Sequence, residues 1–266
     1  MVAASSKKET KKSRINYPLL QEKLEKAVEK SIPKNEIVGV AFSAGIDSGT
    51  IAQVVRKFSK KAILLTVGVK GSVDISRAEP FAKKWKIKWV KKILTPTEIN
   101  ENYLLAGKIL HTNDRLQQTL GAVNVSIAKL ARENGIKTVF VGSGADELFC
   151  GYATFDSVRN DPAACEALRK EKVENVKEHD VKREVTCGKK FGVKIIAPFL
   201  DESFAVEAMK IPAISNLQGK YGKIRKNVLR RLAQRMGVPI EMVTAPKKAM
   251  QYGSGVNKAI KLRKNL

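Results

Sequence analysis

Short, continuous apolar runs recur along the chain and predict the strands of a parallel sheet. Residues 37–42, 62–69 and 138–141 consist almost entirely of apolar residues. Runs of this length are typical of strands buried on both faces, because helices cover both sides of a parallel sheet. Residues 89–94 predict a further, more polar strand.

Segments with apolar residues at helical spacing separate these runs. Leu20, Leu24 and Val28 recur every four residues and predict a helix over residues 17–31. Further helices are expected over residues 50–58, 75–86 and 115–134. Alternating strands and helices indicate an α/β fold with a doubly wound, mostly parallel sheet.

The strand signals stop near residue 150, and the chain divides into three expected parts. We expect a basic, flexible arm over residues 1–15 and a nucleotide-binding α/β core over residues 16–155. Residues 156–266 are expected to form a helical, strongly basic portion that completes the domain. One short apolar stretch, residues 193–200, lies within that portion.

The composition favours a globular protein of a reducing compartment. Of the 266 residues, 43% are apolar, which is enough for an ordinary core. No run of about 18 apolar residues occurs, so we expect no membrane-spanning helix. The three cysteines are widely spaced and form no CxxC pair, and only two histidines are present. These counts argue against zinc sites and a disulfide framework and favour the cytoplasm.

The charge is strongly positive and uneven. The formal net charge is +24, and residues 220–266 hold thirteen basic residues and a single acidic one, Glu241. Such a field attracts polyanions, so RNA, and tRNA in particular, is a candidate partner. A solvated, lysine-rich surface is the alternative interpretation.

Two glycine-containing turns follow buried strands and carry the candidate chemistry. Residues 43–48 (SAGIDS) lie between a strand and a helix, where small residues let backbone N–H groups approach an anion. Residues 142–152 (GSGADELFCGY) follow the strand at 138–141. The acids Asp47, Asp146 and Glu147 are expected to bind a cation rather than a phosphate directly.

These turns resemble motifs of the asparagine synthetase family. Residues 43–48 are similar to the SGGxDS loop (PP-loop) of ATP pyrophosphatases, and residues 142–152 to the SGEGADExFGGY segment of asparagine and β-lactam synthetases. Three more matches stand in the family's order, at residues 66–74, at 197–201 (APFLD), and at 223–231 with 246–251. The chain is identified as a member of this family, corresponding to a synthetase domain that stands alone without the glutaminase domain.

The resemblance implies a fold of the adenine nucleotide alpha hydrolase type, with ATP and Mg²⁺ as cofactors. Mg²⁺ would lie between Asp47 and Asp146. Lys248, or its neighbour Lys247, would stabilise charge on the phosphates, and Asp201 and Glu147 are further candidate catalytic residues. The implied nucleotide-binding residues are Phe42, Ser43, Ala44, Gly45, Asp47, Ser48, Val67, Gly68, Gly142 and Ser143.

The reaction implied by the resemblance is adenylation of a small carboxylic acid, followed by transfer of the acyl group to ammonia or an amine. Without a glutaminase domain, ammonia is expected from solution or from a separate amidotransferase. Ser143 stands where the family has a glutamate placed toward the acceptor. A hydroxyl cannot act as a general base near pH 7, so another acid, such as Glu147 or Glu184, takes that role or the substrate is not aspartate.

Two other functions fit the same sequence. The first is an RNA-modifying enzyme with the same ATP chemistry, similar in principle to tRNA-lysidine synthetase, in which the basic C-terminal portion binds tRNA. The second is a non-catalytic protein that senses ATP or binds RNA. The substitution at Ser143 favours that last interpretation, whereas the retained Asp47 and Asp146 argue against it, because buried acids are costly without a cation.

Overall fold

The computed structural model describes residues 15–218, 224–246 and 249–263, which build an α/β fold around a five-stranded sheet. The strands are β1 (Val38–Ala41), β2 (Ala62–Gly68), β3 (Lys88–Ile93), β4 (Thr138–Phe140) and β5 (Lys194–Ile196). They lie in the order β3-β2-β1-β4-β5, and every neighbouring pair is parallel. The expected doubly wound, parallel α/β sheet is therefore confirmed.

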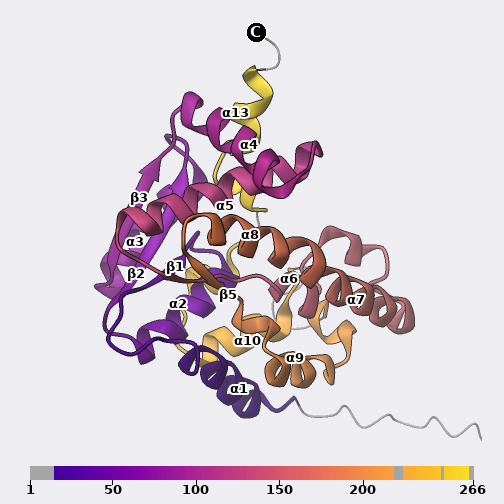
Figure 1. Cartoon of the computed structure of the whole chain (residues 1–266). Coiled ribbons are helices and arrows are strands. Elements are labelled where there is room, and N and C mark those ends of the chain that lie inside the picture. Colours follow the sequence, from indigo (N-terminus) through magenta and orange to yellow (C-terminus); the bar gives the residue numbers. More distant parts are fainter. Residues whose placement is uncertain (1–14, 219–223, 247–248, 264–266) are drawn as a thin grey trace, which may run out of the picture.

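Helices cover both faces of the sheet (Figure 1). The longer ones are α1 (Tyr17–Glu29), α2 (Ile46–Phe58), α3 (Val73–Trp85), α4 (Pro96–Leu110), α5 (Arg115–Glu133), α7 (Pro162–Val176), α8 (Lys182–Lys190), α9 (Glu202–Met209), α10 (Asn227–Arg235) and α13 (Val256–Arg263). Short helices are α6 (Ala145–Leu148), α11 (Ile240–Thr244) and α12 (Met250–Gly253). Within the described residues, none of the helices is long and apolar enough to span a membrane.

The alternation of side chains along β2 explains the two helical layers. Leu64 packs into the core shared with α1, α2 and α10, whereas Ile63 and Leu65 pack into the core shared with α4, α5 and α13. Successive side chains of a strand point to opposite faces, so one strand supplies both cores. All seven residues of β2 are buried, as its apolar sequence predicts.

The two edges of the sheet differ from the interior strands. β3 forms one edge and carries the exposed Lys88 and Lys91, and exposed lysines discourage the edge from pairing with another chain. β5 forms the other edge and pairs with β4. The portion over residues 156–266, expected to be helical apart from one short apolar stretch, contributes this fifth strand from that stretch.

The helix α4 was not predicted from the sequence. Its apolar residues are interspersed with polar ones, but its start carries a clear signal in the capping box formed by Thr95 and Glu98. The Thr95 side chain accepts a hydrogen bond from the Glu98 backbone N–H, and the Glu98 carboxylate accepts one from the backbone N–H of Thr95. This pairing satisfies two N–H groups that would otherwise lack partners at the helix end.

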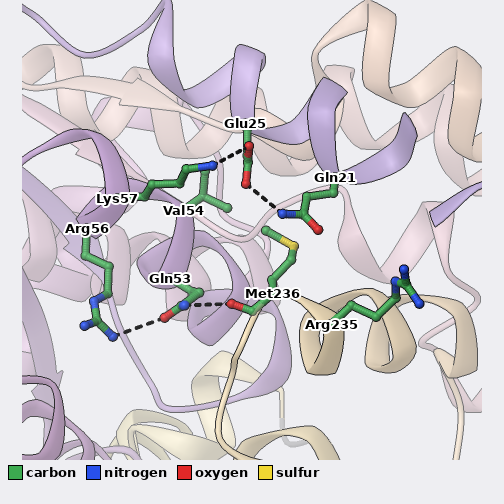
Figure 2. Close-up of a pocket in the computed structure, with 8 residues that line it drawn as sticks. All are labelled: Gln21, Glu25, Gln53, Val54, Arg56, Lys57, Arg235 and Met236. Carbon is green, nitrogen blue, oxygen red and sulfur yellow. Dashed lines mark hydrogen bonds and ion pairs between the residues drawn. The ribbon is translucent and has the colours of Figure 1, made fainter. Parts of the chain in front are cut away.

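Polar contacts around a hollow of about 340 Å³ join α1, α2 and α10 (Figure 2). Lys57 of α2 forms an ion pair of 2.7 Å with Glu25 of α1, and Gln53 donates a hydrogen bond of 2.7 Å to the carbonyl of Met236. The polar residues around the hollow are thus engaged mostly with one another. These contacts hold together the helices that support the loop after β1.

Candidate active site

The two glycine-containing turns meet at one edge of the sheet. β1 and β4 are parallel neighbours, so the loops after both strands open at their shared carboxyl end, where α/β proteins bind ligands. Gly142 lets the two loops touch, because a Cβ atom there would lie 2.9 Å from the Cβ of Asp47 and 3.2 Å from the Ser48 backbone nitrogen. A larger residue at position 142 would force the loops apart.

Two serines hold the loop that precedes α2. The hydroxyl oxygens of Ser43 and Ser48 lie 3.2 Å apart, and the Ser43 backbone N–H donates to the Ser48 hydroxyl at the same distance. Ala44 between them has a φ of +55°, in the left-handed region, which explains why a glycine suits this position in related loops. Gly45 caps α2, whose first N–H groups offer a favourable end for an anion.

Asp47 and Asp146 converge on a lysine that was not assigned from the sequence. The Lys226 ammonium lies 2.6 Å from both carboxylate oxygens of Asp47 and 2.8 Å from Oδ1 of Asp146. Burial opposes the charge on Lys226, but the two carboxylates outweigh it and hold its pKa above the ordinary value. Asp47, Lys226 and Asp146 therefore form a cluster of charged side chains that connects the loops after β1 and β4.

The cluster suits a magnesium ion that arrives with other oxygen ligands. Among the described residues, no group of three or more His, Cys, Asp or Glu side chains could hold a metal alone. Mg²⁺ in proteins is commonly bound by one or two carboxylates together with substrate phosphates and water. Asp47 and Asp146 fit that donor set, with the N-terminus of α2 next to them for the phosphates.

A cavity of about 600 Å³ lies beside the cluster and extends between α5 and the segment that leads into α8. Its lining combines the two loops with apolar residues of β2 and α5, among them Val67, Leu120 and Val123. The far end is polar. The predicted residues that line the cavity are Phe42, Ser43, Asp47, Ser48, Val67, Gly142, Ser143, Asp146 and Glu147.

Glu184 lies beside Ser143, the position at which the family has a glutamate. The Ser143 hydroxyl lies 2.8 Å from each carboxylate oxygen of Glu184, and both side chains line the cavity. Burial raises the pKa of Glu184 to about 7. A carboxylate from α8 therefore lies beside position 143, and the role of Glu184 as the acid that replaces the family glutamate stays a prediction.

Glu147 is a second buried acid beside Asp146. Tyr152 donates a hydrogen bond to its carboxylate, and only 4% of Glu147 is exposed. Burial, reinforced by the neighbouring charge of Asp146, raises the pKa of Glu147 to about 7. The cavity therefore holds two carboxyl groups that can exchange protons near neutral pH.

Arg183, next to Glu184, is fixed by three partners. Its guanidinium donates to Asp180 at 2.6 Å, to Gln117 at 2.8 Å and to Asn124 at 3.2 Å. These residues line the polar end of the cavity. They come from α5, from α8 and from the turn before α8, where the sequence carries no recognisable motif that would have identified them.

The structure does not bring every predicted residue to the cavity. Asp201 begins α9 and forms an ion pair with Lys30 of α1, outside the described cavity lining. This contact ties α9 to α1 and gives Asp201 a structural role at this position, apart from the cavity in which it was expected to act. Lys247 and Lys248 lie outside the described residues.

Three of the expected nucleotide-binding residues support the cavity rather than line it. Ala44 is buried in the core, and Gly45 caps α2. Gly68 packs closely on the next loop, since a Cβ atom there would lie 2.3 Å from the Ser72 hydroxyl. Their small size shapes the loops that the lining residues occupy.

Sequence comparisons agree with this geometry. Residues 19–178 and 159–266 match the protein-family model of asparagine synthase. A Methanocaldococcus jannaschii protein, named provisionally as a glutamine-hydrolysing asparagine synthetase, is 31% identical over 92% of this chain and 51% of its own length. A glutamine-hydrolysing asparagine synthetase of Zea mays is 27% identical over 81% of this chain and 39% of its own length. The chain thus spans about half or less of these relatives.

Two solved structures are similar to this chain over most of its length, at low identity. The tRNA thiolase NcsA of Methanococcus maripaludis, determined with its 4Fe-4S cluster, has a TM-score of 0.45 and 18% identity, covering 94% of this chain and 74% of that one. NMN synthetase of Francisella tularensis has a TM-score of 0.42 and 13% identity, covering 95% and 96%. Family membership rests instead on the family model, whose two matches together span nearly the whole sequence, and by this measure the chain belongs to the asparagine synthase family.

Proposed function

We propose that this chain is an ATP-dependent ligase that forms an amide together with AMP and pyrophosphate. The observation that carries the proposal is the meeting of Asp47, Asp146 and Lys226 beside the N-terminus of α2, at the edge of a cavity of about 600 Å³. Two carboxylates and a helix N-terminus are suited to Mg²⁺ and the phosphates of ATP. Mg²⁺ bound there would neutralise charge on the phosphates.

The first step is adenylation of a small carboxylic acid. A carboxylate oxygen attacks the α-phosphorus of ATP, and the bond from that phosphorus to pyrophosphate breaks. Lys226 provides positive charge beside the departing phosphates, in addition to the charge expected from Lys248 or Lys247. Preorganised charges of this kind lower the barrier because they face the place where charge develops.

The second step transfers the acyl group to nitrogen. Ammonia or an amine attacks the acyl carbon, AMP leaves, and the nitrogen gives up a proton. Glu184 is suited to accept that proton, because its pKa of about 7 lies near working pH and the Ser143 hydroxyl holds its carboxylate. Ammonia would come from solution or from an amidotransferase.

The experiment that tests the proposal measures pyrophosphate release by the purified chain with ATP, Mg²⁺ and a panel of amino acids and other small carboxylic acids. At least one acid should stimulate release. Asp47→Asn should reduce release by about a hundredfold or more, as expected when a charge-stabilising group of an active site is lost. Asp201→Asn is the matched control and should retain activity.

The two steps are separated with Glu184→Gln. This variant should retain exchange of labelled pyrophosphate into ATP, which reports adenylation, and should lose most amide formation with ammonia. An absence of pyrophosphate release with every acid would contradict the ligase. Undiminished amide formation by Glu184→Gln would remove Glu184 from the second step while leaving the first intact.

A further inference from the structure

The Lys226 ammonium occupies the space between the two carboxylates. Its side chain is 1% exposed, whereas those of Asp47 and Asp146 are 24% and 20% exposed. The lysine therefore reaches the acids from the protein interior, and the acids keep an open side. The ammonium sits 2.6–2.8 Å from the oxygens that a bound cation would use.

The fold provides a dedicated place for this lysine. Lys226 precedes α10 in a left-handed backbone conformation with a φ of +64°, which is uncommon for a residue with a side chain. Gly151 leaves the space that the ion pair needs, since a Cβ atom there would lie 1.9 Å from Oδ1 of Asp146 and 2.2 Å from Cε of Lys226. Both features position an ammonium group next to Asp146.

A free divalent cation meets two obstacles at this position. It has to displace an ammonium that is already paired with both carboxylates, and breaking a buried ion pair leaves charge without a partner. It would also gain few ligands, because Mg²⁺ holds its water tightly and the chain offers it two carboxylates. Nucleotide phosphates remove both obstacles, since they add oxygen ligands for the metal and new acceptors for the ammonium.

We propose that Lys226 acts as an internal counter-ion that excludes free divalent cations and admits the metal only together with a nucleoside triphosphate. The choice of a nucleoside triphosphate as the ligand rests on the function proposed above. Metal and nucleotide then enter as one complex. Lys226 is a positioning residue in the empty site and contacts the phosphates in the filled one.

The test titrates Mn²⁺ alone into the wild-type chain and its variants, with free Mn²⁺ followed by electron paramagnetic resonance. Lys226→Met should bind one Mn²⁺ at least about tenfold more tightly than the wild type. Leaving a buried charge without its partner costs more free energy than a tenfold change in affinity represents, and a bound Mn²⁺ would remove that cost. Lys57→Met is the matched control, because Lys57 pairs with Glu25 outside the cavity, and should bind like the wild type.

Lys226→Gln covers the case in which the Met variant does not fold. It keeps N–H donors for the carboxylates and removes the charge, so it should also bind Mn²⁺ more tightly. The added site should disappear when Asp47→Asn is combined with either variant. Wild-type protein should gain thermal stability from Mn²⁺ with α,β-methylene-ATP, and little from Mn²⁺ alone.

Binding of Mn²⁺ alone that is equally tight in the wild type and in the Lys226 variants would overturn the proposal. This outcome is distinct from failure of the ligase function. The metal titration needs no turnover, whereas the ligase is tested by pyrophosphate release.

Discussion

Glu184 is a buried carboxyl group whose protonation is linked to folding. Burial raises its pKa from the ordinary 4.5 to about 7, so between these values the folded chain binds a proton that the unfolded chain has released. The contribution of Glu184 to the free energy of unfolding is fully present below pH 4.5 and is lost as the pH rises through 7. Glu147 acts in the same direction, with a pKa raised to about 7.

We therefore predict that the free energy of unfolding falls as the pH rises from 5 to 8. Glu184→Gln should be more stable than the wild type at pH 8 by on the order of 2 kcal/mol and should show a shallower pH dependence. Urea unfolding at several pH values measures both. Glu171→Gln, which alters an exposed acid, is the control and should follow the wild type. A Glu184→Gln curve parallel to that of the wild type would contradict the linkage.

The hydrogen bond between Ser143 and Glu184 shows that local sequence motifs identify only part of the candidate site. Asp47, Asp146 and Ser143 were found because each lies in a glycine-containing turn after a buried strand. Glu184 contacts Ser143 across 41 residues of sequence, from the first turn of the charged helix α8. Lys226 lay within a recognised motif, but only the folded chain brings its ammonium to both acids.

At the scale of elements, two helices end in a residue that is poorly suited to its backbone conformation. Lys86 ends α3 and His111 ends α4, with φ of +53° and +49°. This left-handed cap suits glycine, because other residues place Cβ too close to the backbone. Both side chains are exposed, so neither compensates by packing.

Lys86→Gly should raise the free energy of unfolding by about 0.5–1 kcal/mol, because glycine adopts the left-handed cap without strain. Lys84→Gly is the matched control two residues earlier, where an exposed lysine lies within α3 and glycine should cost about 1 kcal/mol. Thermal and urea unfolding of the two variants measure the difference. Destabilisation of Lys86→Gly equal to that of Lys84→Gly would contradict the role of the cap.

The elements that the sequence predicted share a simple physical origin. β1, β2 and β4 are buried on both faces, so their apolar runs stand out in the sequence. β5 has three residues and a partly exposed burial pattern, and its short run was placed in a helical portion. Such an edge strand is defined by its partner β4 more than by its own composition.

At the scale of the whole molecule, the net charge is +24, but part of the positive charge after position 220 is buried or paired within the domain. Of the basic residues after position 220, Lys226 is committed to the acid cluster and Arg230 is 1% exposed, with its guanidinium bound to backbone carbonyls of Val243 and Ala245. Arg225 donates to the carbonyl of Gly151. These three cations form contacts within the domain itself, although the basic region as a whole was expected to attract RNA.

Other basic residues of the same region remain exposed and keep RNA binding a testable prediction. Arg231 and Arg235 lie one turn apart on α10, and Arg56 lies across the hollow from Arg235. Side chains in this arrangement can contact phosphates without a cost to the core. Their reversal should therefore affect RNA binding and leave folding intact, in contrast to reversal of Arg230.

We predict that the wild-type chain binds bulk tRNA at low salt and that affinity falls steeply as salt is added, because each neutralised phosphate releases a counterion. Arg231→Glu with Arg235→Glu should weaken binding and reduce the slope of log affinity against log salt by about 1.5, the value for two phosphate contacts. Lys170→Glu with Lys182→Glu changes the net charge equally at exposed positions on α7 and α8. If this control weakens binding as much, the effect belongs to the overall field of the protein and not to α10. Undetectable tRNA binding at low salt would leave the positive charge as a solvated surface.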